Sequence, residues 1–253
     1  MEQSFTHQVD KKAIPTCPIL GVHIAAIDMP WLLAFTEKHL EALSGDYICV
    51  SNVHTTVTAW KDETYRAVQN GGILAIPDGG PLSGTGRKRG YESMRRVTGP
   101  DYMLQAIELG LSKGWRHYFY GSTPETLKKM EEKLRERFPD IQIAGTYSPP
   151  FRALSAEEDG EIVEKINKTA PDFVWVGLGA PKQELWMRDH QGKIHGLMVG
   201  VGAAFDYTAG NISRAPQWMQ RHNLEWLYRL MQDPKRLFKR YFVTNTTYII
   251  QAN

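Results

Sequence analysis

The chain alternates short apolar runs with longer amphipathic segments over most of its length. The apolar runs show no period-two alternation with polar residues, which is typical of strands buried on both faces of a parallel sheet. We expect six such strands, at residues 47–50, 72–76, 117–120, 141–145, 173–176 and 196–201. Amphipathic helices separate them, so the pattern predicts a layered α/β fold with a mainly parallel sheet.

Helix start signals support this reading. Ser122-Thr123-Pro124-Glu125 predicts a helix that ends near Phe138, before a proline. Ser155 is followed three residues later by Glu158, which predicts a capped helix there. Another helix is expected at residues 101–110. We therefore predict a Rossmann-like α/β catalytic core at residues 1–213.

The chain changes character from residue 214 onward. Two helices are predicted, at residues 218–231 and 235–250, with Asp233-Pro234 between them. Seven basic residues oppose two acidic ones here, although the whole chain carries only +2. On the second helix an apolar stripe has cations beside it: Leu237, Phe238, Tyr241 and Phe242 next to Lys235, Arg236, Lys239 and Arg240.

An apolar stripe bordered by cations is typical of an interfacial helix that lies on anionic lipid. We predict a helical appendage at residues 214–253 that associates with the membrane. A helix that covers the core with a solvated basic edge is the alternative.

Composition agrees with a soluble globular protein. The 253 residues are 42% hydrophobic and 23% charged, ordinary values for a soluble domain. Cys17 and Cys49 form no disulfide framework and have no metal-ligand spacing, so we expect two buried thiols in a reducing compartment. The polar N-terminus resembles no signal peptide and no apolar run is long enough to cross a bilayer, which predicts a cytoplasmic location.

Polar residues follow two predicted strands at the sheet edge where α/β sites are built. Asp78, after residues 72–76, is a candidate general base, although Pro-Asp-Gly is also common turn chemistry. Asn52 and His54 follow residues 47–50, and His54 is either a ligand group or simply a helix-start residue.

Glycines and cations at other strand ends suggest a phosphate-bearing ligand. Two predicted strands are each followed by a glycine-containing turn into a helix. Together these two turns indicate a nucleotide-binding site more strongly than either turn alone. Arg96 precedes the 101–110 helix, and guanidinium groups suit bidentate phosphate recognition. The candidate ligand-binding residues of these turns are Gly121, Ser122, Gly177, Gly179, Lys182 and Gln183.

Metal-binding patterns are missing from the sequence. There is no Asp-x-Asp pair, no His-x-x-x-His and no Cys/His cluster, so we expect no metal and no bound cofactor. A diphosphate would then have to be neutralised by Arg, Lys and backbone amides.

Taken together, these segments resemble the WecG/TagA/CpsF family of bacterial glycosyltransferases. The most specific matches are Gly179-Ala180-Pro181-Lys182-Gln183-Glu184 and Glu225-Trp226-Leu227-Tyr228-Arg229. Further matches lie at residues 50–54, 77–79, 96–99, 120–122, 176–178 and 200–206, in the same order as in the family.

The resemblance implies transfer of a sugar from a UDP-sugar to an undecaprenyl-diphosphate-linked saccharide at the inner face of the membrane, in teichoic acid, capsule or exopolysaccharide synthesis. By resemblance, Asp78 is the catalytic base, Asn52 and Gln183 line the pocket, and Arg96 helps to hold substrate. In an inverting transfer, Asp78 would deprotonate the acceptor hydroxyl as it attacks the anomeric carbon.

The family's appendage contributes arginines to the lipid-diphosphate or to the leaving UDP. Arg229 and Arg236 match that pattern, whereas Lys239 stands where a third arginine is expected, with Arg240 next to it. Many members have a threonine where this chain has Val50, so no hydroxyl role is carried over to that position.

Three questions stay open at this level: the donor sugar, the acceptor linkage and the oligomeric state, for which a homo-oligomer is possible. Two other classes of protein are alternatives to this family. A nucleotide-sugar-modifying enzyme should show Gly-x-Gly-x-x-Gly at the first strand, which is missing. A non-catalytic nucleic-acid-binding protein would explain the basic C-terminus but not Asp78. We therefore expect no nucleic-acid partner.

Overall fold

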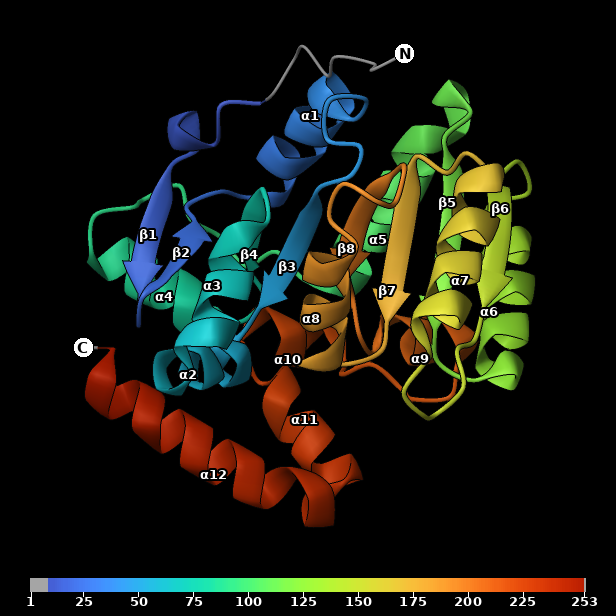
Figure 1. The fold of residues 1–253 in the computed structure, drawn as a ribbon. Helices are drawn as coiled ribbons and strands as arrows, with labels where there is room; N and C mark the ends of the chain where they lie inside the picture. The colour runs from blue at the N-terminus through green and yellow to red at the C-terminus, as the bar shows by residue number, and fades with distance from the viewer. Residues whose placement is uncertain (1–8, 253) are drawn as a thin grey trace.

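The computed structural model describes residues 9–252, which form an eight-stranded sheet between helical layers (Figure 1). The strands lie in the order β1-β2-β4-β3-β8-β7-β5-β6. All neighbours are parallel except β1 and β2, an antiparallel hairpin at one edge. The strands are Thr16–Ile19 (β1), Val22–Ala25 (β2), Tyr47–Ser51 (β3), Leu74–Pro77 (β4), Arg116–Gly121 (β5), Gln142–Tyr147 (β6), Phe173–Gly177 (β7) and Leu197–Gly200 (β8).

Two helices begin at the predicted caps, Thr123 and Ser155, and a third begins after Thr98, for which no cap was predicted. Thr98, Thr123 and Ser155 each accept a hydrogen bond from a backbone N–H three residues ahead, which satisfies a free donor of the first turn. The helices are Met29–His39 (α1), Val53–Lys61 (α2), Glu63–Gly71 (α3), Gly80–Lys88 (α4), Gly99–Gly110 (α5), Pro124–Arg137 (α6), Ala156–Lys168 (α7), Lys182–Asp189 (α8), Ala204–Ala209 (α9), Gln217–Arg221 (α10), Glu225–Gln232 (α11) and Pro234–Gln251 (α12), with short 3-10 turns at Lys11–Ala13 and Leu111–Lys113.

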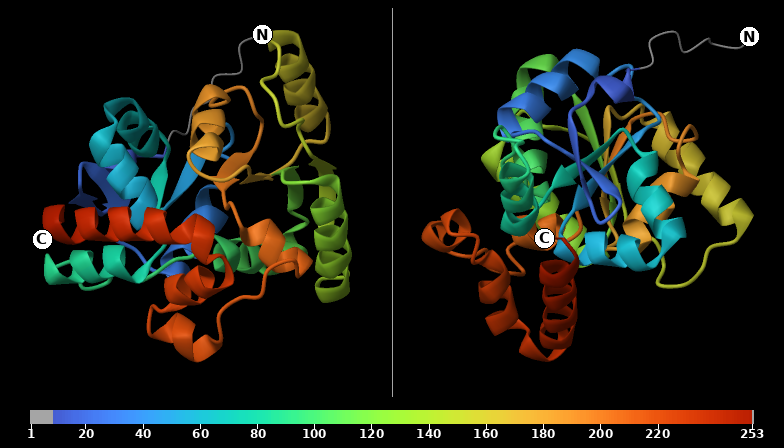
Figure 2. Two further views of the ribbon diagram at one scale, coloured as in Figure 1. Left: turned by 90° about the horizontal axis from the view of Figure 1, so that it is seen from below. Right: turned by 90° about the vertical axis from the view of Figure 1, so that its left-hand side faces the viewer.

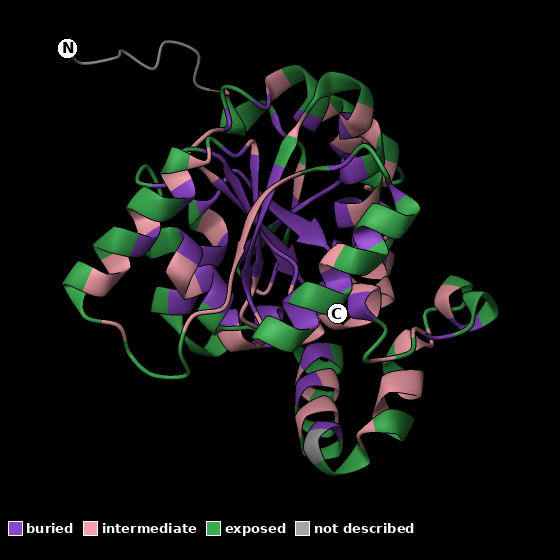
Figure 3. Cartoon of the chain, turned by 90° about the vertical axis from the view of Figure 1, so that its right-hand side faces the viewer, coloured by how far each residue is buried: buried purple, intermediate pink, exposed green. Residues whose placement is uncertain are grey.

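The sheet is covered on both faces, which explains its uninterrupted apolar strands. Alternate residues of each strand enter two separate cores: Phe173 and Trp175 pack with α1, α5, α6 and α9, whereas Val174 and Val176 pack with α2, α3, α7 and α8. Figure 2 shows the sheet between these two layers, and its residues are buried in Figure 3. The prediction of a layered, mainly parallel α/β fold is confirmed.

The β1–β2 hairpin at the edge of the sheet was missed by the sequence reading. Its turn is Leu20-Gly21, with φ angles of 50° and 82°. Both central residues of such a turn need positive φ, and Asn-Gly or Asp-Gly is the usual sequence signal for it. With leucine at the first of these positions, the sequence does not indicate the turn. Pro18 inside β1 is tolerated because the strand lies at the edge. Cys17 and Cys49 are free and buried, as predicted.

Helices α10, α11 and α12, here called the C-terminal helices, lie across the carboxyl edge of the parallel strands (Figure 1). The single helix predicted over residues 218–231 is wrong, because the chain breaks between α10 and α11. Asn223 sits in that break with a φ of 58°, a left-handed conformation that asparagine tolerates better than most residues. A Cβ on Gly80 would lie 2.2 Å from the Asn223 Cγ, so the turn packs directly on α4.

The last helix, α12, is anchored at its far end. The Tyr248 hydroxyl lies 3.0 Å from the Thr85 Oγ1, and the Arg89 guanidinium donates to the Ala252 carbonyl at 2.6 Å. Leu237 is 1% exposed, whereas Phe238 is 62% exposed. The predicted apolar stripe is therefore divided: one side is buried and the other faces outward.

Candidate active site

The site residues predicted after β3, β4, β5 and β7 lie at the carboxyl edge of the sheet, and this edge faces the C-terminal helices (Figure 1). Asn52 and Asp78 follow β3 and β4, which are direct neighbours. Gly121 and Gly177 end β5 and β7 and lie opposite each other in the ladder. Strand β8 separates the two pairs. The edge thus has a carboxylate half and a glycine half, as expected for a ligand crevice in an α/β fold.

Asp78 stands at the start of the turn from β4 into α4. Its backbone N–H donates to the Ser51 carbonyl at 2.7 Å, which ties the turn to β3. Gly79 follows with a φ of 139°, a conformation open mainly to glycine. The half-buried carboxylate accepts no hydrogen bond from any described residue, so nothing supports the alternative of a self-bonded turn.

Four charged side chains beside Asp78 join the core to the C-terminal helices, and we call them the four-charge cluster: Arg96, Asp101, Arg214 and Glu225. Glu225, from α11, pairs with Arg96 and lies 3.3 Å from the Arg214 Nε. The Arg214 guanidinium also makes a bidentate pair with Asp101, at 2.5 and 2.8 Å. Burial alone would raise the pKa of Asp101, but the bonds from Arg214 and Thr98 hold it below its ordinary value.

This environment shifts the proton affinity of Asp78. Burial raises the pKa of Asp78 to about 6, and Arg96 is the strongest opposing influence. Glu225 and Asp101 push it upward, while Arg214 pulls it downward. A carboxylate with a pKa near 6 is ionised at neutral pH and yet a stronger base than an exposed aspartate, which suits general-base chemistry.

The end of β3 brings an imidazole and an arginine together. Asn52 caps α2, and its Oδ1 accepts from the N–H groups of His54 and Thr55 at 3.0 and 3.2 Å. Burial lowers the pKa of His54, and the charge of Arg240 on α12 lowers it further. The His54 Nδ1, Arg240 Nε and Arg96 Nε are all buried without a hydrogen-bond partner among the described residues.

The glycine half is shaped by close backbone contact. A Cβ on Gly121, whose φ is 123°, would lie 2.7 Å from the Gly177 carbonyl carbon. The Ser122 N–H donates to the Gly177 carbonyl at 3.2 Å, and Ser122 itself has a φ of 58°. A Cβ on Gly177 would collide with the Phe205 ring at 2.6 Å. These two turns accept only glycine where they meet.

Residues 177–181, here called the 177–181 loop, lead into α8. The Gly179 N–H donates to the Gln183 Oε1 at 3.1 Å, which folds the loop over the buried Gln183 side chain. Pro181 stands at the N-cap of α8, in keeping with the expected helix start. Lys182, the first residue of the helix, is exposed.

The predicted cations of the C-terminal helices are placed differently from one another. The Arg229 guanidinium lies 5.6 Å from the Tyr207 ring centroid, and burial raises the pKa of Tyr207 to about 12. Lys239 is exposed, whereas its neighbour Arg240 is half-buried beside α2. Arg236 belongs to α12, but its side chain lies outside the described residues.

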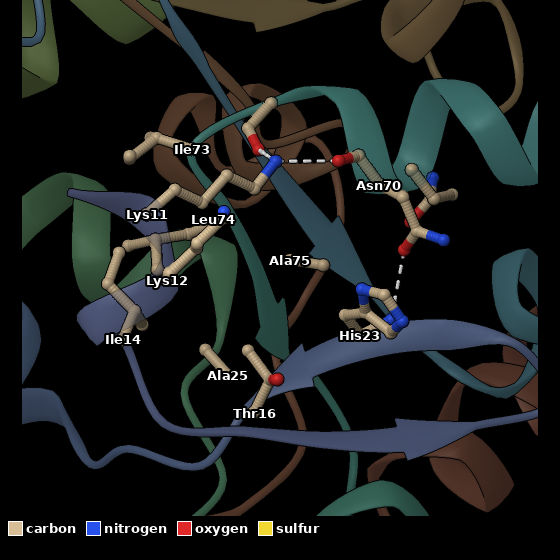
Figure 4. A pocket seen from close by; sticks show the side chains of 12 residues that line it. Lys11, Lys12, Ile14, Thr16, His23, Ala25, Asn70, Ile73, Leu74 and Ala75 are labelled. Atoms are coloured by element: carbon tan, nitrogen blue, oxygen red, sulfur yellow. Dashed lines mark hydrogen bonds between the residues drawn. The ribbon is translucent and has the colours of Figure 1, made fainter. Parts of the chain in front are cut away.

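A separate cavity of about 350 Å³ lies at the opposite edge of the sheet, where β4 begins (Figure 4). It holds none of the predicted site residues. The Lys11 Nζ donates there to the carbonyls of Asn70 and Gly72, and the His23 N–H donates to the Asn70 Oδ1. The Lys11 ammonium of this cavity is already bonded to backbone carbonyls, so we do not assign substrate to it.

Sequence reasoning missed Tyr207, the ion pairs of Arg214 and Glu225, and the position of Arg240 near His54. Tyr207 lies on α9, the helix that follows β8, so the strand-edge rule could have directed attention to it. The other contacts depend on how the C-terminal helices dock, which no local pattern reveals. In the part of the chain that the structure describes, His, Cys, Asp and Glu side chains form no group of three that could hold a metal ion.

Comparison with known proteins gives consistent matches. A sequence model described as the glycosyl transferase WecG/TagA/CpsF family matches residues 17–252. An N-acetylglucosaminyldiphosphoundecaprenol N-acetyl-beta-D-mannosaminyltransferase from Bacillus spizizenii (strain ATCC 23059 / NRRL B-14472 / W23) is 30% identical over 199 residues, 78% of this chain and 76% of the relative.

Proteins with the same name from two other bacteria also match. That of Bacillus subtilis (strain 168) is 30% identical over 204 residues, 80% of this chain and 78% of the relative. That of Staphylococcus aureus (strain MW2) is 27% identical over 192 residues, 76% of this chain and 74% of the relative.

Proposed function

The chain belongs to the WecG/TagA/CpsF family of glycosyltransferases, and we propose that it moves a sugar from a UDP-sugar to a saccharide linked to undecaprenyl diphosphate. The family is one of glycosyltransferases, which favours this class over the two competing classes. The names of its relatives specify N-acetylglucosaminyldiphosphoundecaprenol as acceptor and an N-acetylmannosaminyl group as the transferred sugar. We carry the lipid-linked acceptor to this chain and leave the donor sugar to experiment.

Asp78 carries the proposed mechanism, because it is a half-buried carboxylate with a pKa of about 6 at the ligand edge of the sheet. Its carboxylate takes the proton of the acceptor hydroxyl while the hydroxyl oxygen bonds to the anomeric carbon of the donor. The bond from that carbon to the UDP oxygen breaks on the opposite face, so the configuration inverts and UDP leaves as an anion.

The leaving diphosphate needs positive charge and hydrogen-bond donors. The buried, unpartnered Arg96 Nε, Arg240 Nε and His54 Nδ1 provide unused hydrogen-bonding capacity beside the site. Arg229 adds a further cation over Tyr207. We propose that these side chains neutralise the diphosphate and that turnover needs no metal ion.

The outward side of the C-terminal helices is the proposed membrane surface. No helix among residues 9–252 combines the length and apolarity needed to cross a bilayer. Trp218, Phe238, Phe242 and Ile249 are each more than half exposed, and Lys239 lies exposed on the same helix as three of them. Apolar side chains enter the interface while each nearby cation contributes roughly 1 kcal/mol of attraction to anionic lipid.

The test of the proposed function is a donor screen with purified protein, a lipid-diphosphate-linked N-acetylglucosamine acceptor, a panel of UDP-sugars and EDTA. Turnover with one donor is expected, and Asp78→Asn should abolish it while the protein stays folded. Full activity of that variant would rule out the base role. If UDP fails to bind in calorimetry, the UDP-sugar donor is wrong.

A second assay addresses the membrane surface. Removal of residues 216–253 should release the protein from vesicles that contain anionic lipid, and unchanged binding would defeat this assignment. A self-associating surface would instead give concentration-dependent dimers in sedimentation and no lipid dependence.

A further inference from the structure

Five polar side chains are buried between α3, α8 and the ends of β3 and β7. They are Ser51, Tyr65, Gln69, Gln183 and Glu184, and each is no more than 4% exposed. Burial of a polar group lowers the stability of the fold unless the group is hydrogen-bonded, so a buried polar cluster is expected either to be fully hydrogen-bonded or to have a functional role. None of the five was needed for the transfer chemistry derived above except Gln183, which was predicted from the family resemblance.

Hydrogen bonds run through this group from the β3 side. The Ser51 hydroxyl donates to the Gln69 Oε1 at 2.6 Å, and the Gln69 Nε2 donates to the Tyr65 hydroxyl oxygen at 3.0 Å. The Tyr65 hydroxyl lies close enough to the Glu184 carboxyl for each group to affect the pKa of the other. This series of hydrogen bonds ends at the Tyr65 hydroxyl.

A second series reaches Glu184 from the glycine half of the site. The Gly179 N–H donates to the Gln183 Oε1 at 3.1 Å, and the Gln183 Nε2 donates to the Glu184 Oε1 at 2.9 Å. The other carboxyl oxygen, Oε2, is buried and has no hydrogen-bond partner in the described part of the chain. The series from the glycine half therefore bonds to Glu184, whereas the series from β3 ends at the Tyr65 hydroxyl next to it.

The direction of the donors dictates the residue type at the centre. An ionised carboxylate accepts at both oxygens and donates at neither. A glutamine at this position would direct its NH2 group either toward the Tyr65 hydroxyl or toward the NH2 group of Gln183. Either choice leaves a buried donor without an acceptor.

The two series begin at backbone that shapes the site. Ser51 immediately precedes Asn52, and its carbonyl accepts the Asp78 N–H at 2.7 Å. In the second series, Gly179 lies within the 177–181 loop. The two series thus begin at the turn that carries the base and at the loop of the glycine half, on either side of strand β8, and they end at neighbouring side chains, Tyr65 and Glu184.

We propose that Glu184 is a positioning residue for glycosyl transfer, which holds the 177–181 loop in place by accepting a hydrogen bond from the Gln183 amide, whose oxygen in turn accepts the Gly179 N–H. It does not touch substrate. Its effect on catalysis rests on the proposed function, whereas its effect on the loop does not. The donor binds between the two halves, so loosening the loop weakens donor binding more than it slows the chemical step.

Two readouts on the full chain test this role. Hydrogen exchange of the Gly179 amide reports the bond to Gln183 directly, because that N–H is the donor. In Glu184→Gln we expect this amide to exchange roughly tenfold faster than in the wild type, as for the loss of one buried hydrogen bond. We also expect the KM for the donor to rise by about the same factor, with a smaller change in kcat.

Matched variants separate positioning from general stability. Glu164→Gln makes the same chemical change on α7, where the side chain is 75% exposed, and should leave both readouts at wild-type values. The double change Gln183→Glu/Glu184→Gln restores a donor–acceptor pair at each contact and should recover most of the protection of the Gly179 amide. Recovery by an inverted pair would not follow from volume or packing alone.

The outcomes are distinct. If Glu184→Gln unfolds at lower denaturant but its Gly179 amide exchanges as in the wild type, Glu184 only fills the core and the proposal is overturned. Should Glu184→Gln fail to fold, Glu184→Asp keeps the charge but withdraws the carboxylate from the Gln183 amide, and unchanged exchange of the Gly179 amide in that variant would also overturn the proposal. If the wild type transfers no sugar from any UDP donor, the proposed function fails while the exchange result still decides the role of Glu184.

Discussion

Replacement of Asp78 by asparagine should remove activity and at the same time make the protein more stable at neutral pH. Burial raises the pKa of this carboxyl from 3.8 to about 6. Each pKa unit corresponds to about 1.4 kcal/mol, so ionisation of Asp78 in the folded protein costs about 3 kcal/mol relative to the unfolded chain. Asparagine has nearly the same shape and never ionises, so it removes that cost.

Because the pKa of Asp78 is raised on folding, the pH range in which the two proteins differ in stability can be derived. Below about pH 3, well under the unfolded pKa of 3.8, the carboxyl is protonated in both the folded and the unfolded protein, and the two variants should be equally stable. As the pH rises toward 6, the unfolded chain has already released the proton while the folded protein still holds it, so wild-type stability falls. Above about pH 7 the difference should level off, with the asparagine variant the more stable by about 3 kcal/mol.

Urea unfolding of both proteins at several pH values between 5 and 8 measures this difference, with Asp140→Asn as a control at an exposed aspartate. The same base should make kcat/KM rise with pH about an apparent pKa near 6. A stability difference that does not change with pH, or an asparagine variant less stable than the wild type at pH 8, would refute the reasoning.

Three other predictions follow from the same structure. Glu225→Gln removes a charge that raises the pKa of the base, so the midpoint of the pH–activity profile should fall, whereas Arg96→Gln should raise it. Gly121→Ala places a Cβ 2.7 Å from the facing backbone of β7 at a φ of 123°, and urea unfolding should show a loss of about 2 kcal/mol or more. Phe238→Ser and Phe242→Ser lie on exposed positions, so vesicle sedimentation should show weaker binding while the unfolding temperature stays close to that of the wild type.

Much of the core could be predicted from the sequence because its signals are local. The uninterrupted apolar runs of β3, β5 and β7 can be explained only by burial on both faces, and Ser155 with Glu158 forms the predicted capping box. The hairpin at Leu20 and the break at Asn223 escaped prediction for one reason. Each requires positive φ at a residue whose type only weakly signals it.

The part of the site that could be predicted is the part formed by residues at the carboxyl ends of the parallel strands. Asp78 and Asn52 follow adjacent strands, so their proximity comes from the parallel sheet alone. The partners of Asp78 could not be inferred in the same way. Arg214 and Asp101 are 113 residues apart, and their contact depends on how the C-terminal helices fold back over the edge of the sheet. Glu184 stood in a recognisable motif, but its complete burial follows only from tertiary packing.

The docking of the C-terminal helices and the strength of the base are physically linked. These helices are held at one end by the pairs of Glu225 with Arg96 and Arg214. At the other end they are held by the hydrogen bond from Arg89 to the Ala252 carbonyl. Glu225 both anchors α11 and neutralises the arginine that most lowers the pKa of Asp78. If the helices lifted, Asp78 would lose the neighbouring carboxylate and part of its burial, and its pKa would fall. The carboxylate is therefore a strong base only while α11 covers the site, so the surface that we assign to the membrane also sets the reactivity of the residue that we assign to catalysis.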